Sequence, residues 1–379
     1  MNIYLDNAST TFPKPKIVTE GIYDYLVNVG GNANRSNYSN SLDSSRSLLL
    51  TREKIAEFFN FDKCENVIFT SNITHSLNIL IRGTLSSGDH AICTSMDHNS
   101  TLRPLHDCVE NSDVKLDIVD ADIFGFINPE DIEAKIKDNT KLVVMSHASN
   151  VTGSIQNIKA IGDICKKHNV FFVVDTAQSA GMLPIDMKYI GANAIAFTGH
   201  KSLLGPQGIG GFIIDDKLNE VCSYLFSGGT GSLSHSLSQP TFLPDKFECG
   251  TMNMPGIIGL SKGIDFINST GIDTIKEKTS FLRNKLIDGI LNIDNFKIYG
   301  SLDNTKGTTC LSINNLKLDP SELSYILDTN GIKTRSGLHC APLAHKSINT
   351  YPTGTVRLSL SYFNSIDDID YTLKVLNNI

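Results

Sequence analysis

At its centre the chain reads Val170-Phe171-Phe172-Val173-Val174-Asp175: five apolar residues followed by one carboxylate. β-Branched and aromatic side chains favour strands, and a strand without polar alternation is typical of a parallel sheet that helices cover on both faces. Similar runs alternate with helical patterns between Asn66 and Asp215. This alternation predicts an α/β fold whose mainly parallel sheet has seven strands, at residues 66–70, 90–94, 115–119, 142–146, 170–175, 194–198 and 211–214.

The pattern changes after Pro255. A helix is predicted over residues 256–267, followed by strands at 297–299, 310–313 and 355–359, which together indicate a smaller α+β domain. At the other end, Pro13 and Pro15 exclude a helix and predict an extended arm. We therefore expect an N-terminal arm (1–15) that packs with the small domain, a large ligand-binding domain (16–255) and a small C-terminal domain (256–379).

Composition narrows the class of protein. The 379 residues, 40% hydrophobic and 19% charged, are typical of a soluble globular protein. A net charge of -7 without any Lys/Arg-rich run argues against nucleic acid or an anionic membrane as the main partner. The apolar runs are too short to span a bilayer, and the start lacks a signal-peptide pattern, so we expect a cytoplasmic protein. The eight cysteines form no CxxC pair, which predicts neither a metal site nor a disulfide framework.

One lysine has a setting suited to covalent cofactor binding. The segment from Thr198 to Gly208 places Lys201 after a hydroxyl and an imidazole and before a glycine-rich turn. A lysine that forms a Schiff base with a phosphate-bearing aldehyde, such as pyridoxal 5'-phosphate (PLP), needs donors for the phosphate and a tight backbone path. A solvated loop lysine is the alternative when this segment is considered alone.

Three other residues support the cofactor hypothesis. Asp175, at a strand end, could face the pyridine nitrogen and keep it protonated, although it could also cap the next helix. Thr74 lies in a strand-to-helix turn, 72–78, that suits a phosphate, although it could be a simple helix cap. His98 follows another strand, where its imidazole could stack on a planar ring.

At these residues the chain resembles the class V, fold-type I PLP-dependent enzymes, and within them the cysteine desulfurase and selenocysteine lyase branch. The resemblance extends almost from end to end, because several motifs occur in the family's order. These motifs are Tyr4-Leu5-Asp6-Asn7-Ala8-Ser9-Thr10-Thr11, Asn150-Val151-Thr152-Gly153, Gly199-His200-Lys201, Phe247-Glu248-Cys249-Gly250-Thr251 and Arg335-Ser336-Gly337-Leu338-His339-Cys340-Ala341-Pro342.

The resemblance implies a role for each matching residue around PLP. Lys201 would carry the cofactor, Asp175 would pair with the pyridine nitrogen, and Gln178 would contact the ring hydroxyl. His98 would stack on the ring. The phosphate contacts would come from Ile73, Thr74, Thr198 and His200, with Gly250 and Thr251 supplied by the neighbouring subunit of a homodimer.

The same resemblance implies which residues bind and attack the substrate. Arg357 would bind the substrate carboxylate through the bidentate geometry of a guanidinium, and Cys340 would be the nucleophile that accepts sulfur. An inert buried cysteine is the alternative for Cys340. Its Arg-x-Gly-x-His-Cys setting resembles the group II, SUF-type enzymes. Further substrate contacts would fall on Asn150, Arg335, Ala8 and His339, and either His98 or His339 would carry protons.

The implied function is removal of sulfur from L-cysteine, which leaves L-alanine and a persulfide on Cys340 for transfer to a protein acceptor. Two other enzymatic activities are alternatives, namely selenocysteine lyase and class V aminotransferase. A non-enzymatic alternative is a sulfur-relay scaffold without catalytic activity. Three positions depart from the family pattern: Leu338 replaces a usual histidine, His75 a usual glutamate, and Cys249 a common alanine.

Overall fold

The computed structural model describes residues 2–34, 36 and 38–379. Its largest sheet has seven strands, and every predicted strand of the large domain belongs to it, with ends that agree to within two residues. Neighbouring strands are parallel except β8, which is antiparallel to β2 and β7. The predicted fold class is confirmed. The sheet order is β2 (Val67–Thr70), β8 (Gly210–Ile214), β7 (Ala194–Thr198), β6 (Phe171–Asp175), β5 (Thr140–Ser146), β3 (His90–Thr94) and β4 (Lys115–Val119).

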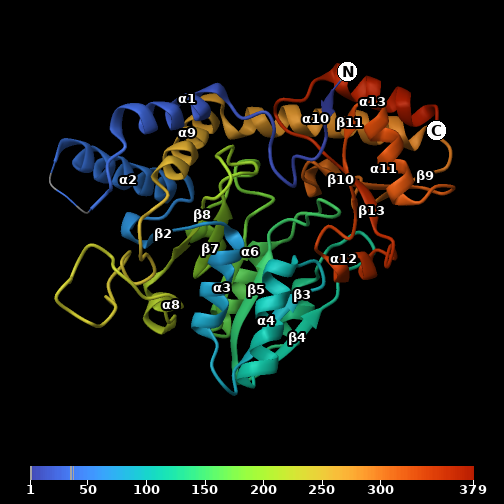
Figure 1. Ribbon diagram of the computed structural model, residues 1–379. Coiled ribbons are helices and arrows are strands. Elements are labelled where there is room, and N and C mark those ends of the chain that lie inside the picture. The colour runs from blue at the N-terminus through green and yellow to red at the C-terminus, as the bar shows by residue number, and fades with distance from the viewer. Residues whose placement is uncertain (1, 35, 37) are drawn as a thin grey trace.

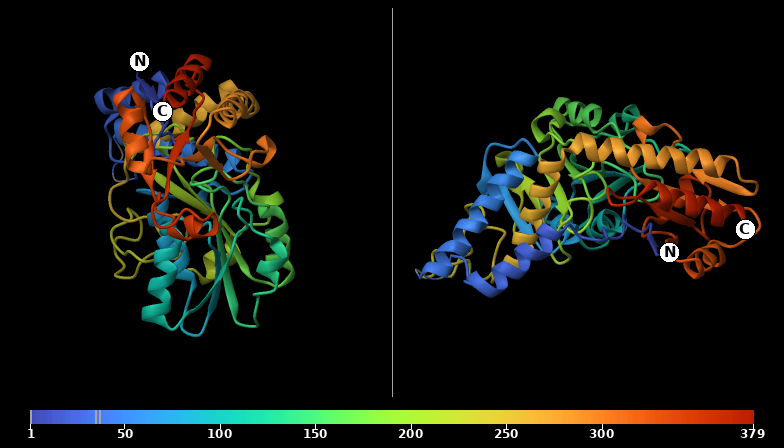
Figure 2. Two further views of the ribbon diagram at one scale, coloured as in Figure 1. Left: turned by 90° about the vertical axis from the view of Figure 1, so that its right-hand side faces the viewer. Right: turned by 90° about the horizontal axis from the view of Figure 1, so that it is seen from above.

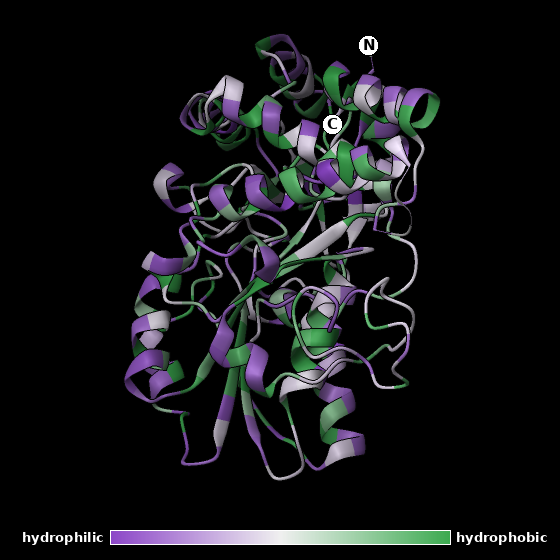
Figure 3. Ribbon diagram, turned by 90° about the vertical axis from the view of Figure 1, so that its left-hand side faces the viewer, coloured by the Kyte–Doolittle hydropathy of each residue, from purple (hydrophilic) through white to green (hydrophobic). Residues whose placement is uncertain are grey.

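Helices cover both faces of this sheet, as the apolar strands require. On β6, Phe172 and Val174 belong to one hydrophobic cluster and Val173 to another, on the opposite face. One face packs against α3 (Ile73–Thr84) and α4 (Asn99–Ser112), which lie in front of the sheet in Figure 1. The other packs against α6 (Ile158–Lys167) and α7 (Met187–Ile190). Hydrophilic and hydrophobic residues alternate along the helices of the molecule (Figure 3), as expected for helices with one buried face.

The remaining helices between residues 16 and 270 surround the seven-stranded sheet. Figure 2 shows α1 and α2 projecting at the end of the molecule opposite to both termini. Helices α1 and α2 both pack on α9. The bounds are α1 (Lys16–Asp24), the π-helix η1 (Tyr25–Val29), α2 (Ser39–Phe58), the 3-10 helix η2 (Cys64–Asn66), α5 (Pro129–Glu133), α8 (Asp216–Val221) and α9 (Met254–Thr270).

A second, antiparallel sheet of four strands follows in the chain. Its order is β12 (Arg335–Gly337), β13 (Thr355–Ser359), β10 (Cys310–Asn315) and β9 (Phe296–Tyr299). The sequence predicted the last three strands but missed β12, whose three residues carry no apolar pattern. The helices in the same part of the chain as this second sheet are α10 (Ile272–Leu291), α11 (Pro320–Thr329), α12 (Pro342–Ser347) and α13 (Ile366–Asn377), with the 3-10 helix η3 (Asn304–Lys306).

The N-terminal arm begins beside the small sheet. Strand β1 (Ile3–Tyr4) pairs in parallel with β11 (Ile332–Lys333), and Asp6 forms a bridge to Ser359. Both termini therefore lie at the same end of the molecule (Figure 1). The domain boundaries given above stay a prediction. Within the described residues, no helix is both long and apolar enough to cross a membrane.

Candidate active site

A cavity of about 360 Å³ lies where the parallel strands of the large sheet end. The last residues of β5, β6 and β7, namely Ser146, Asp175 and Thr198, line it together. This is the edge at which open α/β sheets bind ligands. Most of the predicted site residues are brought together here: Ala8, Ile73, Thr74, His98, Asn150, Asp175, Gln178, Thr198, His200, Lys201, Arg335 and Arg357.

Lys201 lies in the tight turn between β7 and β8. The Leu204 amide donates to the Lys201 carbonyl and the Gly205 amide to the Gly199 carbonyl, both at 2.8 Å. Glycine suits position 199 because a Cβ there would lie 2.8 Å from Cγ2 of Ile209. Burial lowers the pKa of Lys201 to about 8, with Asp175 acting in the opposite direction. Part of the amine is therefore unprotonated near neutral pH, as a nucleophile requires.

Asp175 presents a carboxylate at the end of β6 and is only 4% exposed. Its Oδ1 accepts a hydrogen bond of 2.8 Å from the Ala177 amide. Burial raises the pKa of Asp175, while this hydrogen bond and the charge of Lys201 act to lower it. No salt bridge to Asp175 occurs among the described residues. A buried carboxylate without an ionic partner is costly, so the site suits a ligand that brings a cationic group, such as a protonated ring nitrogen.

Unpaired donors occupy another part of the same cavity. Gly210 of β8 is opposite both Thr70 and Thr198, so the turn before α3 and the end of β7 share one edge of the sheet. Thr198 Oγ1 and His200 Nδ1 are buried and have no hydrogen-bond partner. Ile73 stands in the first turn of α3, where amides lack intrahelical acceptors. A helix N-terminus beside unpaired polar atoms that can donate hydrogen bonds suits an anionic group such as phosphate.

His98 is held in one tautomer. It caps α4, and its Nδ1 accepts a hydrogen bond of 3.0 Å from the Ser100 amide. Burial lowers the pKa of His98 to about 4, with smaller effects in the same direction from Lys201 and the nearby arginines. The ring is therefore neutral at physiological pH, with its proton on Nε2. His98 thus presents to the cavity an uncharged imidazole, which can stack on a planar ring.

Two arginines line the cavity from adjacent strands. Arg335 of β12 and Arg357 of β13 are directly opposite each other. Arg357 is 1% exposed, and its Nη2 donates to Asp6 Oδ1 and to Ser9 Oγ, both at 2.7 Å. Its Nη1 donates to the Asn150 carbonyl at 3.1 Å, while its Nε has no partner. The arginine is therefore fixed, with donor capacity left over.

Asp6 and Ser9 are functional candidates that the sequence reasoning missed. Both belong to the quoted motif at residues 4–11, and the arm was predicted to pack with the small domain, but the sequence does not indicate that these two side chains contact Arg357 of β13. Next to them, the Ala8 carbonyl accepts a hydrogen bond of 3.1 Å from Gln178 Nε2. The arm thus contacts two residues that line the cavity, Arg357 and Gln178.

Cys340 lies between β12 and α12, beside the arginines. All eight cysteines belong to the described ranges, and among them Cys340 alone is exposed. Its Sγ is 3.4 Å from Nη2 of Arg335. The residue has a φ of 59°, and its carbonyl accepts a hydrogen bond of 2.8 Å from the Asn99 amide, next to His98. An exposed thiol beside a guanidinium that lines the cavity is well placed to act as a nucleophile.

Four predicted residues do not line this cavity: Cys340, which contacts the lining residue Arg335, and His339, Gly250 and Thr251. His339 is buried, with Nε2 at 3.2 Å from Thr355 Oγ1, and burial strongly lowers its pKa. Its contribution is the carbonyl, which accepts a hydrogen bond of 2.7 Å from Asn150 Nδ2. This placement favours His98 over His339 as the proton carrier. Gly250 and Thr251 lie on an exposed segment away from the cavity, so their predicted role depends on a second subunit.

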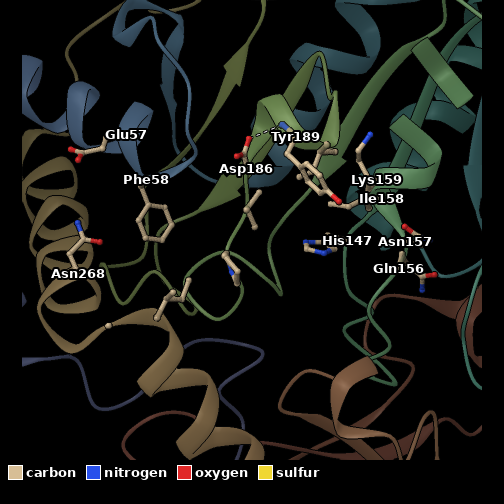
Figure 4. A pocket seen from close by; sticks show the side chains of 15 residues that line it. Glu57, Phe58, His147, Gln156, Asn157, Ile158, Lys159, Asp186, Tyr189 and Asn268 are labelled. Carbon is tan, nitrogen blue, oxygen red and sulfur yellow. Dashed lines mark hydrogen bonds between the residues drawn. The ribbon is translucent and has the colours of Figure 1, made fainter. Parts of the chain in front are cut away.

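A larger hollow of about 950 Å³ lies elsewhere, around His147 (Figure 4). Neither Lys201 nor Asp175 lines it. Two of its polar side chains have structural roles, because Asn157 caps α6 and Asp186 caps α7 through the Tyr189 amide, whereas Nδ1 of His147 is buried without a hydrogen-bond partner in the described part of the chain. Burial lowers the pKa of His147 to about 4, so its ring is uncharged. The size of this hollow therefore does not make it the active site.

Comparisons with known proteins agree with the geometry. A family model described as Aminotransferase class-V matches residues 3–372. A probable cysteine desulfurase of Methanothermobacter thermautotrophicus is 36% identical, covering 100% of this chain and 94% of the relative. Another, from Pyrococcus abyssi, is 33% identical with the same coverage. The apo structure of a cysteine desulfurase from Thermococcus onnurineus matches with a TM-score of 0.94 and 32% identity, covering 100% of this chain and 94% of that one.

Proposed function

The chain belongs to the class V aminotransferase family and, within it, to the cysteine desulfurases; on this premise we propose that it removes sulfur from L-cysteine at the cavity around Lys201. The products are L-alanine and a persulfide on Cys340. The observation that carries the proposal is the exposed Cys340 thiol, whose Sγ is 3.4 Å from Nη2 of Arg335, a residue that lines the cavity together with Lys201 and Asp175. An aminotransferase needs the lysine and the carboxylate but not the thiol.

Enzymes of this family depend on PLP, and the cavity fits that cofactor. Among the described residues, the carboxylate of Asp175 has no salt-bridge partner, and Thr198 Oγ1 and His200 Nδ1 are buried polar atoms without hydrogen-bond partners. We propose that Lys201 holds PLP covalently. Asp175 pairs with the ring nitrogen of PLP, and Gln178 contacts its ring hydroxyl. The phosphate contacts fall on Ile73, Thr74, Thr198 and His200 of the same subunit. When bound, PLP supplies a reactive carbonyl carbon and a ring that accepts electrons from the substrate.

The chain's own residues then bind and deprotonate the substrate. The Lys201 amine, with its pKa lowered to about 8, is the base for the proton on the substrate Cα. Neutral His98 keeps the ring plane in place and can donate from Nε2. Arg357 binds the substrate carboxylate, in the orientation that Asp6, Ser9 and the Asn150 carbonyl impose. Arg335, Asn150, Ala8 and His339 complete the proposed substrate side.

Sulfur transfer needs no external oxidant. The Cys340 sulfur bonds to the substrate sulfur while the bond from that sulfur to Cβ breaks. The proton that the Cys340 thiol loses is balanced by one gained at Cβ, so cysteine plus thiol gives alanine plus persulfide. The Arg335 guanidinium stabilises the attacking thiolate by its positive charge.

We expect Asp6→Asn to weaken substrate binding. The amide keeps the shape of the side chain but removes the charge that faces the buried Arg357, so the guanidinium loses its fixed orientation. The predicted result is a KM for L-cysteine about tenfold higher, with a smaller change in kcat and unchanged PLP content. Steady-state kinetics measure this, with Asp24→Asn on the exposed face of α1 as the control. A lower KM would instead mean that Asp6 competes with the substrate for Arg357.

A homodimer and a protein acceptor complete the proposal. Gly250 and Thr251 would reach the phosphate of the neighbouring subunit's PLP, which the exposure of their segment allows. Large apolar side chains are exposed on the loop that precedes this segment, as expected for a protein interface; they are Tyr224, Leu225, Phe226, Leu233, Leu237 and Phe242. The exposure of Cys340 supports transfer of the persulfide sulfur to another protein.

The experiment that tests the function is incubation of the PLP-loaded protein with L-cysteine in the absence of a reductant. We expect about one alanine per active site, followed by further turnover only when a thiol reductant is added. Alanine formed only from L-selenocysteine would indicate a selenocysteine lyase. Amino-group transfer to a 2-oxo acid without sulfur release would indicate an aminotransferase, and no PLP binding would indicate a scaffold.

A further inference from the structure

Lys14 is a partly buried cation at the end of the N-terminal arm. Its Nζ donates a hydrogen bond of 2.6 Å to the carbonyl of His200. Among the described residues, no carboxylate forms a salt bridge with it. Burial lowers the pKa of Lys14 to about 8, so the ammonium form still prevails at neutral pH. Because taking an ammonium even partly out of water without a counter-ion is costly, the contact with His200 calls for an explanation.

The arm directs three donors at this one carbonyl. Besides Lys14, the Thr11 amide donates at 3.0 Å and Thr10 Oγ1 at 3.2 Å. The His200 carbonyl belongs to the peptide bond whose nitrogen is that of Lys201. On the other side of Lys201, its own carbonyl accepts the hydrogen bond from the Leu204 amide. Both peptide groups that flank the Lys201 Cα are therefore fixed, one by the arm and one by the turn.

We propose that Lys14 is a positioning residue for Lys201, holding the His200–Lys201 peptide so that the Lys201 amine meets PLP in the productive orientation. This inference rests on the proposed function of Lys201. It assigns to the arm a role in cofactor binding that extends beyond its pairing with the small sheet.

The rest of the arm makes this role more specific. Asp6 and Ser9 hold Arg357, and the Ala8 carbonyl holds Gln178. Residues 6–14 thus connect the carboxylate-binding arginine to the cofactor lysine within a few residues of chain. A shift of the arm at Lys14 would change the distance between the two groups that must act on the same substrate molecule, and small misplacements of such groups are costly to catalysis.

The test compares Lys14→Met with the parent protein. Methionine retains an unbranched side chain of similar length but has no N–H donor and no charge. After PLP is removed and titrated back, we expect the dissociation constant for PLP to rise about tenfold and the visible circular dichroism of bound PLP to decrease. The rate of alanine formation in a single turnover should fall by a similar factor.

Control variants separate positioning from a general loss of stability. Lys16→Met removes a neighbouring exposed lysine, whose ion pair with Glu20 is at the surface, and should leave all three measurements unchanged. Lys14→Arg keeps a charged donor and should recover most of the loss. Thr10→Val removes a neutral donor to the same carbonyl and should weaken PLP binding less, by about threefold; it also serves as the test if Lys14→Met does not fold.

Unchanged PLP affinity and visible circular dichroism in Lys14→Met would overturn the inference, even if its apoprotein melts at a lower temperature. PLP binding by the parent protein tests the proposed function separately. If the parent does not bind PLP at Lys201, the proposed function itself is wrong. If it does, a negative result for Lys14→Met and Thr10→Val concerns the positioning role alone.

Discussion

A Lys201→Ala variant is expected to lose covalent PLP and to form alanine from L-cysteine at least about 10³-fold more slowly than the parent. The loss is large because one amine serves two purposes, as the covalent anchor of the cofactor and as the base for the substrate Cα. Its surroundings support both, since burial lowers the pKa of Lys201 to about 8. Reduction with borohydride, followed by peptide mapping, should find the pyridoxyl group on residue 201 of the parent and nowhere in the variant.

Lys166→Ala is the matched control, because Lys166 is an exposed lysine at the end of α6, away from the cavity. It should keep the parent's PLP content and rate. A Lys201→Ala protein that still fixes PLP covalently, at whichever lysine, would contradict the assignment. A variant that loses covalent PLP but keeps its full rate would show that Lys201 is not the base.

A Cys340→Ala variant is expected to bind PLP as the parent does and to lose sulfur transfer from L-cysteine by roughly 10²-fold or more. The thiol projects from a short turn whose backbone is fixed by the Asn99 amide and by Asn150 Nδ2. Removing its sulfur should therefore leave the cavity unchanged while removing the acceptor of the substrate sulfur. The visible absorbance of bound PLP and the release of sulfide with a reductant measure the two effects separately.

Cys64→Ala provides a control, since Cys64 is a partly exposed thiol outside the cavity. Full sulfide release by Cys340→Ala would exclude the persulfide step. A variant that cleaves L-selenocysteine but not L-cysteine would favour selenocysteine lyase activity, because selenium can leave the substrate without an enzyme thiol.

Most of the sheet was predictable because its strands, except the edge strand β4, are buried on both faces. Runs such as residues 170–175 are apolar throughout, and only such runs fit between two layers of helices. The antiparallel direction of β8 and the existence of β12 were not predictable. Strand direction leaves no mark in residue periodicity, and β12 is held by its pairing with β13 rather than by apolar side chains.

The site was predictable where side chains follow strand ends, and less so where it depends on distant segments. Asp175 and Thr198 end neighbouring strands, so their proximity follows from the sheet. Two partners of Arg357, Asp6 and Ser9, come instead from the arm, more than 300 residues away in sequence. Likewise, the sequence placed His339 beside the thiol but could not show that its ring turns inward to Thr355.

The central claim is that Cys340 accepts the sulfur of L-cysteine. The most direct measurement is the mass of the peptide that contains Cys340, taken after one turnover of the PLP-loaded protein with L-cysteine labelled in its sulfur and without a reductant. The account predicts one labelled sulfur atom on Cys340 for each alanine formed, which a thiol reductant removes. Alanine formed with an unmodified Cys340, or with the label on another cysteine, would contradict it.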